Sequence, residues 1–258
     1  MTNDEFDISI SIVSHNHINM IVDLINDIKR LCDIKFEIIL TLNVHEELPD
    51  FFANPTIDLT ILQNEQPLGF AENHNNAFKA SHGDYFCVLN PDIRFEDNPF
   101  PVMIKCLEAN SLGVVAPLIK NSDGAIEETV RRFPGPFTIF LKAIYHLCGI
   151  DYSSSRPAEN ESYWVAGMFM LFSSKVFLGL GGFDQRYFLY YEDVEICARL
   201  IVKGYRVKVC EEATAIHDAR RDSHHKMIFF KWHLASMSRF FLSKTRLLLL
   251  LQKNHRHV

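Results

Sequence analysis

The chain has 258 residues, of which 48% are hydrophobic and 22% charged, and its formal net charge is −6. These values are ordinary for a globular protein with a sizeable core, built as one large domain or two closely joined halves. No apolar run reaches the roughly 18 residues that span a bilayer, and the N-terminus lacks the pattern of a signal peptide. The six cysteines are scattered without zinc-ligand spacing, which indicates reduced thiols of a cytoplasmic protein.

The first 120 residues alternate short apolar runs with amphipathic segments. The apolar runs predict strands at 8–14, 36–42, 57–62, 85–89 and 113–116. The amphipathic segments predict helices at 17–31, 71–80 and 99–109. Because strand–helix units repeat, we expect an α/β fold, a doubly wound and mainly parallel sheet with helices on both faces.

The alternation changes after Pro117, where we expect a smaller second part. The pattern predicts, in order, an apolar helix ending near 148, a polar loop at 151–162, a strand at 164–172, a glycine- and aromatic-rich turn at 179–191, a helix at 192–203, a strand at 205–209 and a long basic helix at 227–251. We therefore divide the chain into two halves, 1–120 and 121–258, of one continuous domain.

The run Leu89-Asn90-Pro91-Asp92 ends the strand predicted at 85–89. Proline fixes the backbone after Asn90, so we expect Asp92 at the carboxyl edge of the sheet, where open α/β sheets bind ligands. A carboxylate there suits a divalent cation that completes its shell with substrate phosphates, and the alternative is a cap of the next helix. His217, which closes a short apolar strand, is either structural or a second ligand of that cation.

Two further segments carry groups that suit chemistry. Glu192 and Asp193 follow a glycine pair and a run of aromatic residues, and they begin a helix. An aromatic wall would raise their pKa towards the range of a general base, and the alternative is that their charges stabilise the helix N-terminus. The amide-rich segment 64–77 offers neutral donors to a phosphate or a sugar hydroxyl.

Basic residues gather towards the C-terminus. Residues 220–258 hold nine lysines and arginines against one acidic residue, Asp222. Such a segment either favours an anionic partner, a diphosphate or an acidic membrane surface, or forms a solvated helix face. The leucine-rich stretch 240–251 either rests on an anionic membrane or packs into the core. We expect no nucleic-acid partner, because it would leave the acidic first part without a role. Candidate contacts to a diphosphate or an acceptor, with an ordinary surface position as the alternative for each, are Arg131, Arg132, Arg220, Arg221 and Lys226.

Taken in chain order, these motifs resemble those of the family 2 glycosyltransferases with the GT-A fold, and within that family the bacterial rhamnosyltransferase-like members. The resemblance extends from Ile8 to about Lys244. Its segments are the first strand with the turn at 14–16, the segment from Asn64 to Asn75, the run 89–92 in place of the Asp-x-Asp metal motif, Trp164 to Gly167, Gly182 to Asp193, and His217.

The resemblance implies a role for each matching residue. Asp193 would be the catalytic base, with Glu192 beside it, and Asp92 and His217 would hold Mg²⁺ or Mn²⁺. The first half would bind the nucleotide sugar, and the second half would bind the acceptor. The implied donor contacts are Ser14, Asn16, Asn43, Asn75, Asp92 and Gly167.

The sequence departs from the family pattern at three positions. Leu42 stands where the second strand normally ends in an Asp that contacts the base, so Asn43 or backbone groups would substitute. Asn90 replaces the first Asp of the metal motif, which leaves Asp92 as its only carboxylate. Glu195 stands where an Asp is common.

The implied activity is sugar transfer with inversion, from dTDP-L-rhamnose or else a UDP-linked hexose. The implied acceptor is a hydroxyl of a bacterial surface glycan, such as a lipopolysaccharide, or of a lipid-linked glycan. We expect a cytoplasmic enzyme, with or without peripheral contact at the inner face of the cell membrane. The alternative is a GT-A module that binds sugar nucleotides without turnover. A nucleotidyltransferase would instead carry a glycine-rich basic loop where His15-Asn16-His17 stands.

Overall fold

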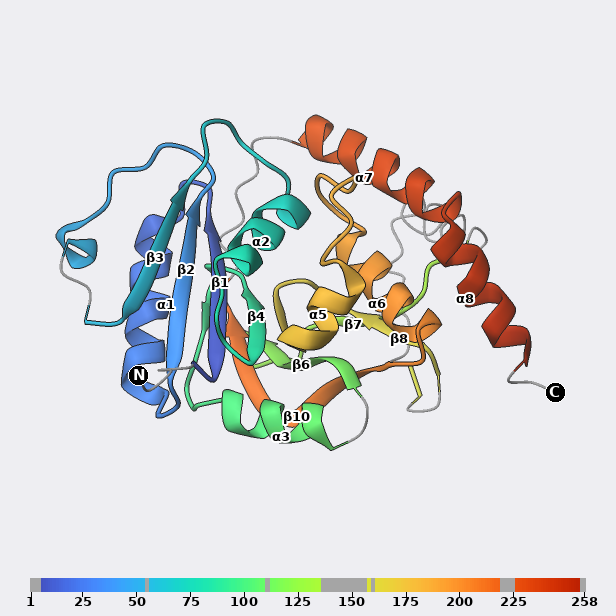
Figure 1. The fold of residues 1–258 in the computed structure, drawn as a ribbon, viewed down its shortest axis with the longest axis horizontal. Helices are drawn as coiled ribbons and strands as arrows, with labels where there is room; N and C mark the ends of the chain where they lie inside the picture. Colours follow the sequence, from blue (N-terminus) through green and yellow to red (C-terminus); the bar gives the residue numbers. More distant parts are fainter. Residues whose placement is uncertain are drawn as a thin grey trace.

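The computed structural model describes residues 6–53, 56–109, 112–135, 157–158, 161–218 and 226–255 (Figure 1). Their centre is an eight-stranded sheet with the order β3-β2-β1-β4-β9-β6-β10-β5. The strands are β1 (Ile8–Ser14), β2 (Phe36–Leu42), β3 (Asp58–Gln63), β4 (Tyr85–Leu89), β5 (Ile93–Arg94), β6 (Leu112–Asn121), β9 (Phe169–Ser173) and β10 (Arg206–His217). β9 is antiparallel to both its neighbours and β5 to β10, while the other pairs are parallel. The predicted mainly parallel α/β sheet is therefore confirmed.

Helices cover both faces of this sheet, as predicted, because successive side chains of a strand point to opposite faces. On β4, Phe86 and Val88 belong to one apolar cluster, with α2, α5 and α6. Cys87 and Leu89 belong to a second cluster, with α1 and α3, and all four side chains are fully buried. The helices are α1 (Ile18–Leu31), α2 (Phe70–Lys79), α3 (Phe100–Glu108), α5 (Ser174–Leu180) and α6 (Glu192–Val202).

The two halves of the chain share this one sheet. β9 comes from the second half, yet it lies between β4 and β6 of the first half. It pairs with both, Leu171 lying opposite Cys87 on one side and opposite Val115 on the other. Residues before and after residue 120 therefore meet along the middle of the sheet. The division of roles between the halves stays a prediction.

The prediction of one strand at 164–172 is wrong. The segment forms two strands, β8 (Tyr163–Val165) and β9, and β8 pairs with β7 (Val130–Arg132) in a separate hairpin that the sequence did not predict. The chain turns between them at Gly167 and Met168, and the backbone N–H of Ala166 donates to the carbonyl of Thr129 at 2.9 Å. Both strands are apolar, so the hydrophobic pattern alone did not reveal the turn.

Other boundaries differ from the sequence pattern in smaller ways. α5 was not predicted, and its last two residues overlap the start of the glycine-rich turn predicted at 179–191. β10 extends the strand predicted at 205–209 to His217 through an irregularity between Cys210 and Thr214. The predicted helix at 227–251 is two helices, α7 (Lys226–Phe241) and α8 (Lys244–His255). The Ser243 hydroxyl accepts from the backbone N–H of Arg246 at 3.1 Å, which caps α8 and separates the two. The helix predicted to end near 148 and most of the loop at 151–162 lie outside the described residues.

α7 and α8 run along one edge of the molecule (Figure 1). α8 packs on α6, where Thr245 Oγ1 donates to Glu195 Oε1 at 3.2 Å and Gln252 Nε2 donates to the carbonyl of Val202 at 3.0 Å. Within the described residues, none of the helices has both the length and the apolar composition that crossing a membrane needs.

Candidate active site

The carboxyl ends of β4 and β10 and the start of β9 meet at one edge of the sheet. The backbone N–H of Asn90 donates to the carbonyl of Met168, just before β9, at 2.8 Å. The backbone N–H of Asp218, just after β10, donates to the carbonyl of Asp92, also at 2.8 Å. The turn after β4 is thus fixed between two other strands, and this places Asp92 at the edge.

Asp92 and His217 form one cluster with Glu127. His217 Nε2 lies 3.1 Å from Asp92 Oδ2, and His217 Nδ1 lies 2.9 Å from Glu127 Oε2. The hydrogen bond with Asp92, helped by the one with Glu127, raises the pKa of His217 to about 9, although burial of the ring opposes the rise. The imidazole is therefore protonated at neutral pH in this arrangement.

Sequence reasoning placed Asp92 and His217 together but missed Glu127. The backbone N–H of Glu127 donates to the carbonyl of Ile119 at 2.9 Å, so the chain folds back along the end of β6. β6 in turn pairs with β10, with Asn121 opposite His217. Glu127 reaches the histidine through this pairing, across 90 positions of sequence, and no local pattern marks it.

The chemistry of this cluster suits a divalent cation. Asp92 Oδ1 is buried and has no hydrogen-bond partner among the described residues. A cation there would replace the proton on His217 Nε2, and Glu127 would orient the ring. No three His, Cys, Asp or Glu side chains of the described segments converge as a metal site by themselves. One carboxylate and one imidazole leave places for phosphate oxygens and water, which is how proteins commonly bind Mg²⁺.

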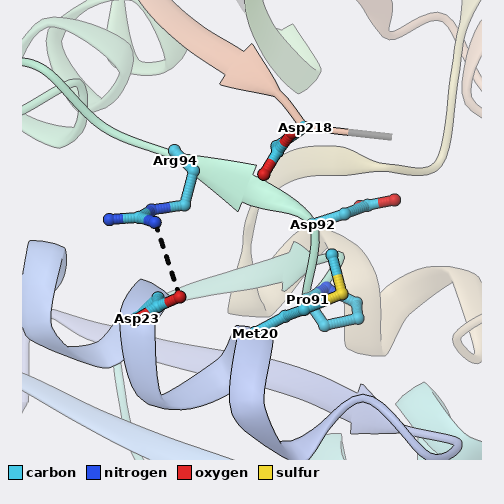
Figure 2. Close-up of a pocket in the computed structure, with 6 residues that line it drawn as sticks. All are labelled: Met20, Asp23, Pro91, Asp92, Arg94 and Asp218. Carbon is cyan, nitrogen blue, oxygen red and sulfur yellow. Dashed lines mark ion pairs between the residues drawn. The ribbon is translucent and has the colours of Figure 1, made fainter. Parts of the chain in front are cut away.

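A small cavity adjoins Asp92 on the side of α1 (Figure 2). Arg94 lines it and is held by α1, with Arg94 Nε 2.6 Å from Asp27 Oδ2 and Arg94 Nη1 3.7 Å from Asp23 Oδ2. Figure 2 shows the Arg94 guanidinium on one side and the Asp92 carboxylate directed to the other. Arg94 therefore fastens α1 to the sheet rather than neutralising Asp92. The lining residues are Met20, Asp23, Pro91, Asp92, Arg94 and Asp218.

The second acidic site is the start of α6, where the Asp193 carboxylate contacts the turn before β9. Asp193 Oδ2 accepts from the backbone N–H of Gly167 at 3.1 Å, and Oδ1 accepts from that of Val194 at 2.7 Å. Burial raises the pKa of Asp193 to about 6, against the effect of these hydrogen bonds. Burial, and then the charge of Asp193, raises the pKa of Glu192 well above its usual range. A carboxyl group with a pKa near 6, as for Asp193, is suited to general base catalysis near neutral pH.

Gly167 connects the two sites. Its N–H binds Asp193, while the next residue, Met168, binds Asn90 through its carbonyl. A Cβ at position 167 would lie 3.3 Å from the Phe70 ring and 3.5 Å from the Asp193 Cβ. Glycine therefore leaves room for the Phe70 ring beside this turn, while the contact with Asp193 would be an ordinary one.

The backbone before α6 is strained. Tyr190 and Tyr191 both have positive φ, 69° and 68°, and neither is glycine. Such residues cost on the order of 1–3 kcal/mol each and persist where their surroundings impose them, often at functional sites. The sequence gives no sign of this strain, because tyrosine is not a residue that marks a left-handed turn.

Of the predicted donor contacts, Ser14 ends β1 and Asn16 lies in the turn that leads to α1. The Ser14 hydroxyl accepts from the backbone N–H of His17 at 3.2 Å, which closes the turn. Asn16 is exposed and left-handed, with φ 66°, and its N–H donates to Glu46 Oε1 at 2.9 Å. Sequence reasoning missed Glu46, which also accepts from the N–H of Ile18 at 3.2 Å. The donor roles of both residues stay predictions.

Asn43, the residue after β2, hydrogen-bonds to the loop that connects β3 to α2. Its Oδ1 accepts from Asn64 Nδ2 and from the backbone N–H of Leu68, both at 2.8 Å, and its Nδ2 donates to the carbonyl of Leu68 at 3.1 Å. Asn64 Nδ2 also donates to Asn73 Oδ1 at 2.7 Å. The amide-rich segment therefore shapes a loop at the edge where a donor would bind, and contact of Asn43 with the base stays a prediction.

Asn75 and the predicted arginines lie in different settings. Both amide atoms of Asn75 bind the backbone of Phe183, each at 2.8 Å, so its donor role stays a prediction.

The charge of Arg131 lowers the pKa of Asp193, although burial dominates. Arg132 pairs with Glu161 at 2.8 Å. Outside the described residues lie Arg220, Arg221 and the Lys226 side chain.

Solved structures share this fold. GalNAc-T7, solved with UDP, GalNAc and Mn²⁺, is 16% identical and covers 85% of this chain and 45% of its own length, with a TM-score of 0.63. The mannosyltransferase PcManGT from Pyrobaculum calidifontis, in complex with GDP-Man and Mn²⁺, is 15% identical and covers 96% of this chain and 74% of its own, with a TM-score of 0.60. The chain therefore has the GT-A fold, with its mainly parallel sheet covered by helices on both faces.

Sequence comparisons then identify the family. The Glycosyl transferase family 2 profile matches residues 9–164. Rhamnosyltransferase WbbL of Escherichia coli K12 is 30% identical over 196 residues, which cover 70% of this chain and 72% of the relative. N-acetylglucosaminyl-diphospho-decaprenol L-rhamnosyltransferase of Mycobacterium tuberculosis is 27% identical over 143 residues, 52% of this chain and 47% of the relative. The chain belongs to glycosyltransferase family 2 and is rhamnosyltransferase-like, an enzyme that transfers a sugar to a glycan acceptor.

Proposed function

We propose that this chain transfers a hexose with inversion from a nucleotide diphosphate sugar to a hydroxyl of a glycan acceptor. The observation that supports this is that both acidic sites hydrogen-bond to the same turn, between β8 and β9. Asn90, two residues before Asp92, binds Met168, and Asp193 binds the adjacent Gly167. Asp92 then serves the donor diphosphate, and Asp193 serves the acceptor.

Asp193 acts as the general base, within the acidic pair that it forms with Glu192. It takes the proton of the acceptor hydroxyl while that oxygen bonds to the anomeric carbon and the bond from this carbon to the diphosphate breaks. The attack comes from the face opposite the leaving group, and no covalent enzyme intermediate forms, so the configuration at the anomeric carbon is inverted. The raised pKa of Asp193, about 6, supports this role because its carboxylate is mostly ionised yet basic near neutral pH.

Asp92 and His217 would hold Mg²⁺ or Mn²⁺, and Glu127 would orient the His217 ring. Bound there, the cation would supply positive charge next to the departing diphosphate. The buried, unpartnered Asp92 Oδ1 supports this assignment. Further support comes from GalNAc-T7 and PcManGT, which were both solved with Mn²⁺.

We infer dTDP-L-rhamnose as the donor, with UDP-linked hexoses next. The rhamnosyltransferase names of the Escherichia coli and Mycobacterium tuberculosis relatives support the first, and the GalNAc-T7 structure with UDP supports the second. The acceptor is a bacterial surface glycan or its lipid-linked precursor, reached from the cytoplasm. The acceptor in the name of the Mycobacterium tuberculosis relative is a sugar on a lipid diphosphate.

Thermal unfolding with a panel of nucleotide sugars tests the donor. The panel holds dTDP-L-rhamnose, UDP-glucose, UDP-N-acetylglucosamine and GDP-mannose, each with Mn²⁺ or with EDTA. A ligand that binds the folded state raises the melting temperature, and we expect the largest rise for dTDP-L-rhamnose with Mn²⁺. Transfer to a lipid-diphosphate-linked N-acetylglucosamine is then followed, with the anomeric configuration of the product read by NMR. Retention of configuration, or no stabilisation by any donor, would contradict the proposal.

We also propose that the outer surface of α7 and α8 contacts an anionic membrane. Residues 226–255 contain six lysines and arginines and no acidic residue. Phe240 and Leu249 are buried against the body of the protein, so part of the leucine-rich stretch does pack into the core. Exposed apolar side chains beside lysine and arginine suit the headgroup region of a bilayer. Those exposed are Met227, Ile228, Phe230, Leu234, Leu242, Leu247, Leu250 and Leu251.

Flotation with vesicles of phosphatidylglycerol and phosphatidylcholine tests this contact. We expect the wild-type chain to float with these vesicles and not with pure phosphatidylcholine. Leu242→Glu with Leu247→Glu should abolish flotation, because both side chains are more than half exposed on this surface. Leu178→Glu is the matched control, since Leu178 is 69% exposed but lies on α5. Equal flotation of the double variant and the control would rule out this surface.

A further inference from the structure

The segment 184–191 leads directly into α6 and ends in the two left-handed tyrosines. L side chains rarely adopt this conformation, so contacts from elsewhere must impose it on both Tyr190 and Tyr191. Because α6 begins at Glu192, the backbone direction at this step decides where the Asp193 side chain lies.

The start of α2 holds one side of this segment. The backbone N–H of Phe70 donates to the carbonyl of Phe188 at 2.9 Å. A Cβ on Gly69 would lie 2.5 Å from the same oxygen, so a residue with a side chain would push the segment away. This contact ties the segment to the half of the chain that carries Asp92.

α7 holds the other side. Ser236 is 2% exposed, and its hydroxyl donates to the carbonyl of Leu189 at 2.9 Å, one residue before the strained pair. The His233 ring lies 5.4 Å from the ring of Tyr190 and 5.4 Å from that of Tyr191, edge-on in both cases. α7 therefore contacts the backbone just before the left-handed step and the side chains within it.

Two more contacts from α7 reach earlier residues of the same segment. The Trp232 ring lies 4.8 Å from the Phe188 ring, and the Arg239 guanidinium donates to the carbonyl of Arg186. The contact at Ser236 differs from these in kind. An apolar side chain would suffice to pack α7, whereas the serine hydroxyl satisfies one particular, partly buried carbonyl.

We propose that α7 is a positioning element for the acceptor-side base and that Ser236 is its positioning residue. The Ser236 hydroxyl fixes the Leu189 carbonyl, the left-handed step follows from that fixed point, and α6 then presents the Asp193 carboxylate at Gly167. This inference rests on the proposed function, in which Asp193 takes the acceptor proton. Without the hydroxyl, the segment relaxes and the carboxylate shifts from its productive place.

The test compares Ser236→Ala with Ser236→Thr and with Ser238→Ala. Threonine keeps the hydroxyl, and Ser238 is an exposed serine two residues further along the same helix. Sub-ångström to ångström misplacement of a catalytic group costs up to about 100-fold, so we expect kcat of Ser236→Ala to fall about 10- to 100-fold. The KM and Kd for the donor should stay within about twofold, since the donor site is untouched. Ser236→Thr should recover most of the rate, and Ser238→Ala should match the wild type. Assays run at a temperature where circular dichroism shows every variant folded.

A double-mutant cycle with Asp193→Asn separates positioning from loss of stability. If Ser236 acts through the Asp193 carboxylate, Ser236→Ala should cause no further loss of kcat in the Asp193→Asn background. Equal kcat of Ser236→Ala and wild type, or the same fold-loss in both backgrounds, would overturn the inference. A fully active Asp193→Asn variant would instead refute the proposed base, so the two failures are distinguishable.

Discussion

The two acidic sites at the sheet edge differ in how the fold controls their charge. The Asp92 side chain is 25% exposed and is paired with His217, whose pKa this contact raises. Asp193 accepts from backbone N–H groups instead, and burial raises its own pKa. At the Asp92 site, the ion pair with His217 stabilises the charged groups. At Asp193, burial removes water from the carboxyl group and so disfavours its charged form.

This difference matches two kinds of chemistry. A partly exposed carboxylate paired with a histidine suits a cation that stays bound through a reaction, because the metal can take the place of the proton on His217 Nε2. A desolvated carboxyl suits a group that gains and loses a proton in each turnover. Four predictions test whether the two sites divide the work in this way, beginning with the largest expected effect.

Asp193→Asn should lower kcat by about 10²- to 10⁴-fold, because it removes the general base while keeping the size of the side chain. Donor affinity, measured by calorimetry with Mn²⁺ present, should stay near the wild-type value. Asp58→Asn, on the exposed edge strand β3, is the control and should keep full activity. Near-normal kcat for Asp193→Asn would remove this residue from the chemistry.

Asp92→Asn should show the opposite division, with the loss in donor binding. Because it removes the single carboxylate of the cation site, we expect metal-dependent donor affinity to fall by at least about 100-fold, more than the loss of an outer partner causes. Titration calorimetry with Mn²⁺ and with EDTA measures this. Asp97→Asn, exposed and five residues further along, serves as the control. Unchanged affinity with Mn²⁺ would place the cation elsewhere.

Glu127→Gln should weaken Mn²⁺ binding by roughly 10- to 100-fold, as is typical when the partner of a metal-binding histidine is lost. It should also lower the pKa of His217, because one of the contacts that raise it is weakened. Histidine NMR titration of the metal-free protein measures the pKa, and Mn²⁺ titration measures the affinity. Asp123→Asn in the same connection after β6 is the control, and an equal effect of both variants would argue against a specific role for Glu127.

The pH dependence of kcat/KM should reflect the raised pKa of Asp193. Asp193 must be ionised to accept a proton, and its pKa is raised to about 6. We therefore expect kcat/KM to fall as the pH drops through about 6, by about tenfold for each unit below it. An acid limb near 4, the usual pKa range of an aspartate, would show that burial does not govern the base in solution.

Much of this arrangement follows from local sequence patterns. The alternation of apolar and amphipathic segments predicted the strands and helices of the first half, because side-chain period and burial are properties of short segments. The turn after the strand at 85–89 predicted Asp92 at the sheet edge, since proline and a strand end act over a few residues. Glu192 and Asp193 at a helix start were visible for the same reason.

Long-range pairings decided the rest. The strand order inserts β9 between β4 and β6, and nothing local to residues 169–173 specifies these neighbours. That insertion brings Gly167 beside Asp193, and the pairing of β6 with β10 brings Glu127 to His217. The neighbouring sequence of such residues does not indicate which distant residue each one contacts.

The sequence by itself determined which segments form strands and helices, and which acids lie at their ends, because those properties depend on neighbours along the chain. The tertiary structure decided the charge and orientation of those acids. Burial of Asp193, pairing of Asp92 with His217 and the hold of Ser236 on Leu189 all depend on elements far apart in the sequence. Desolvation and hydrogen-bond geometry are set by such packing.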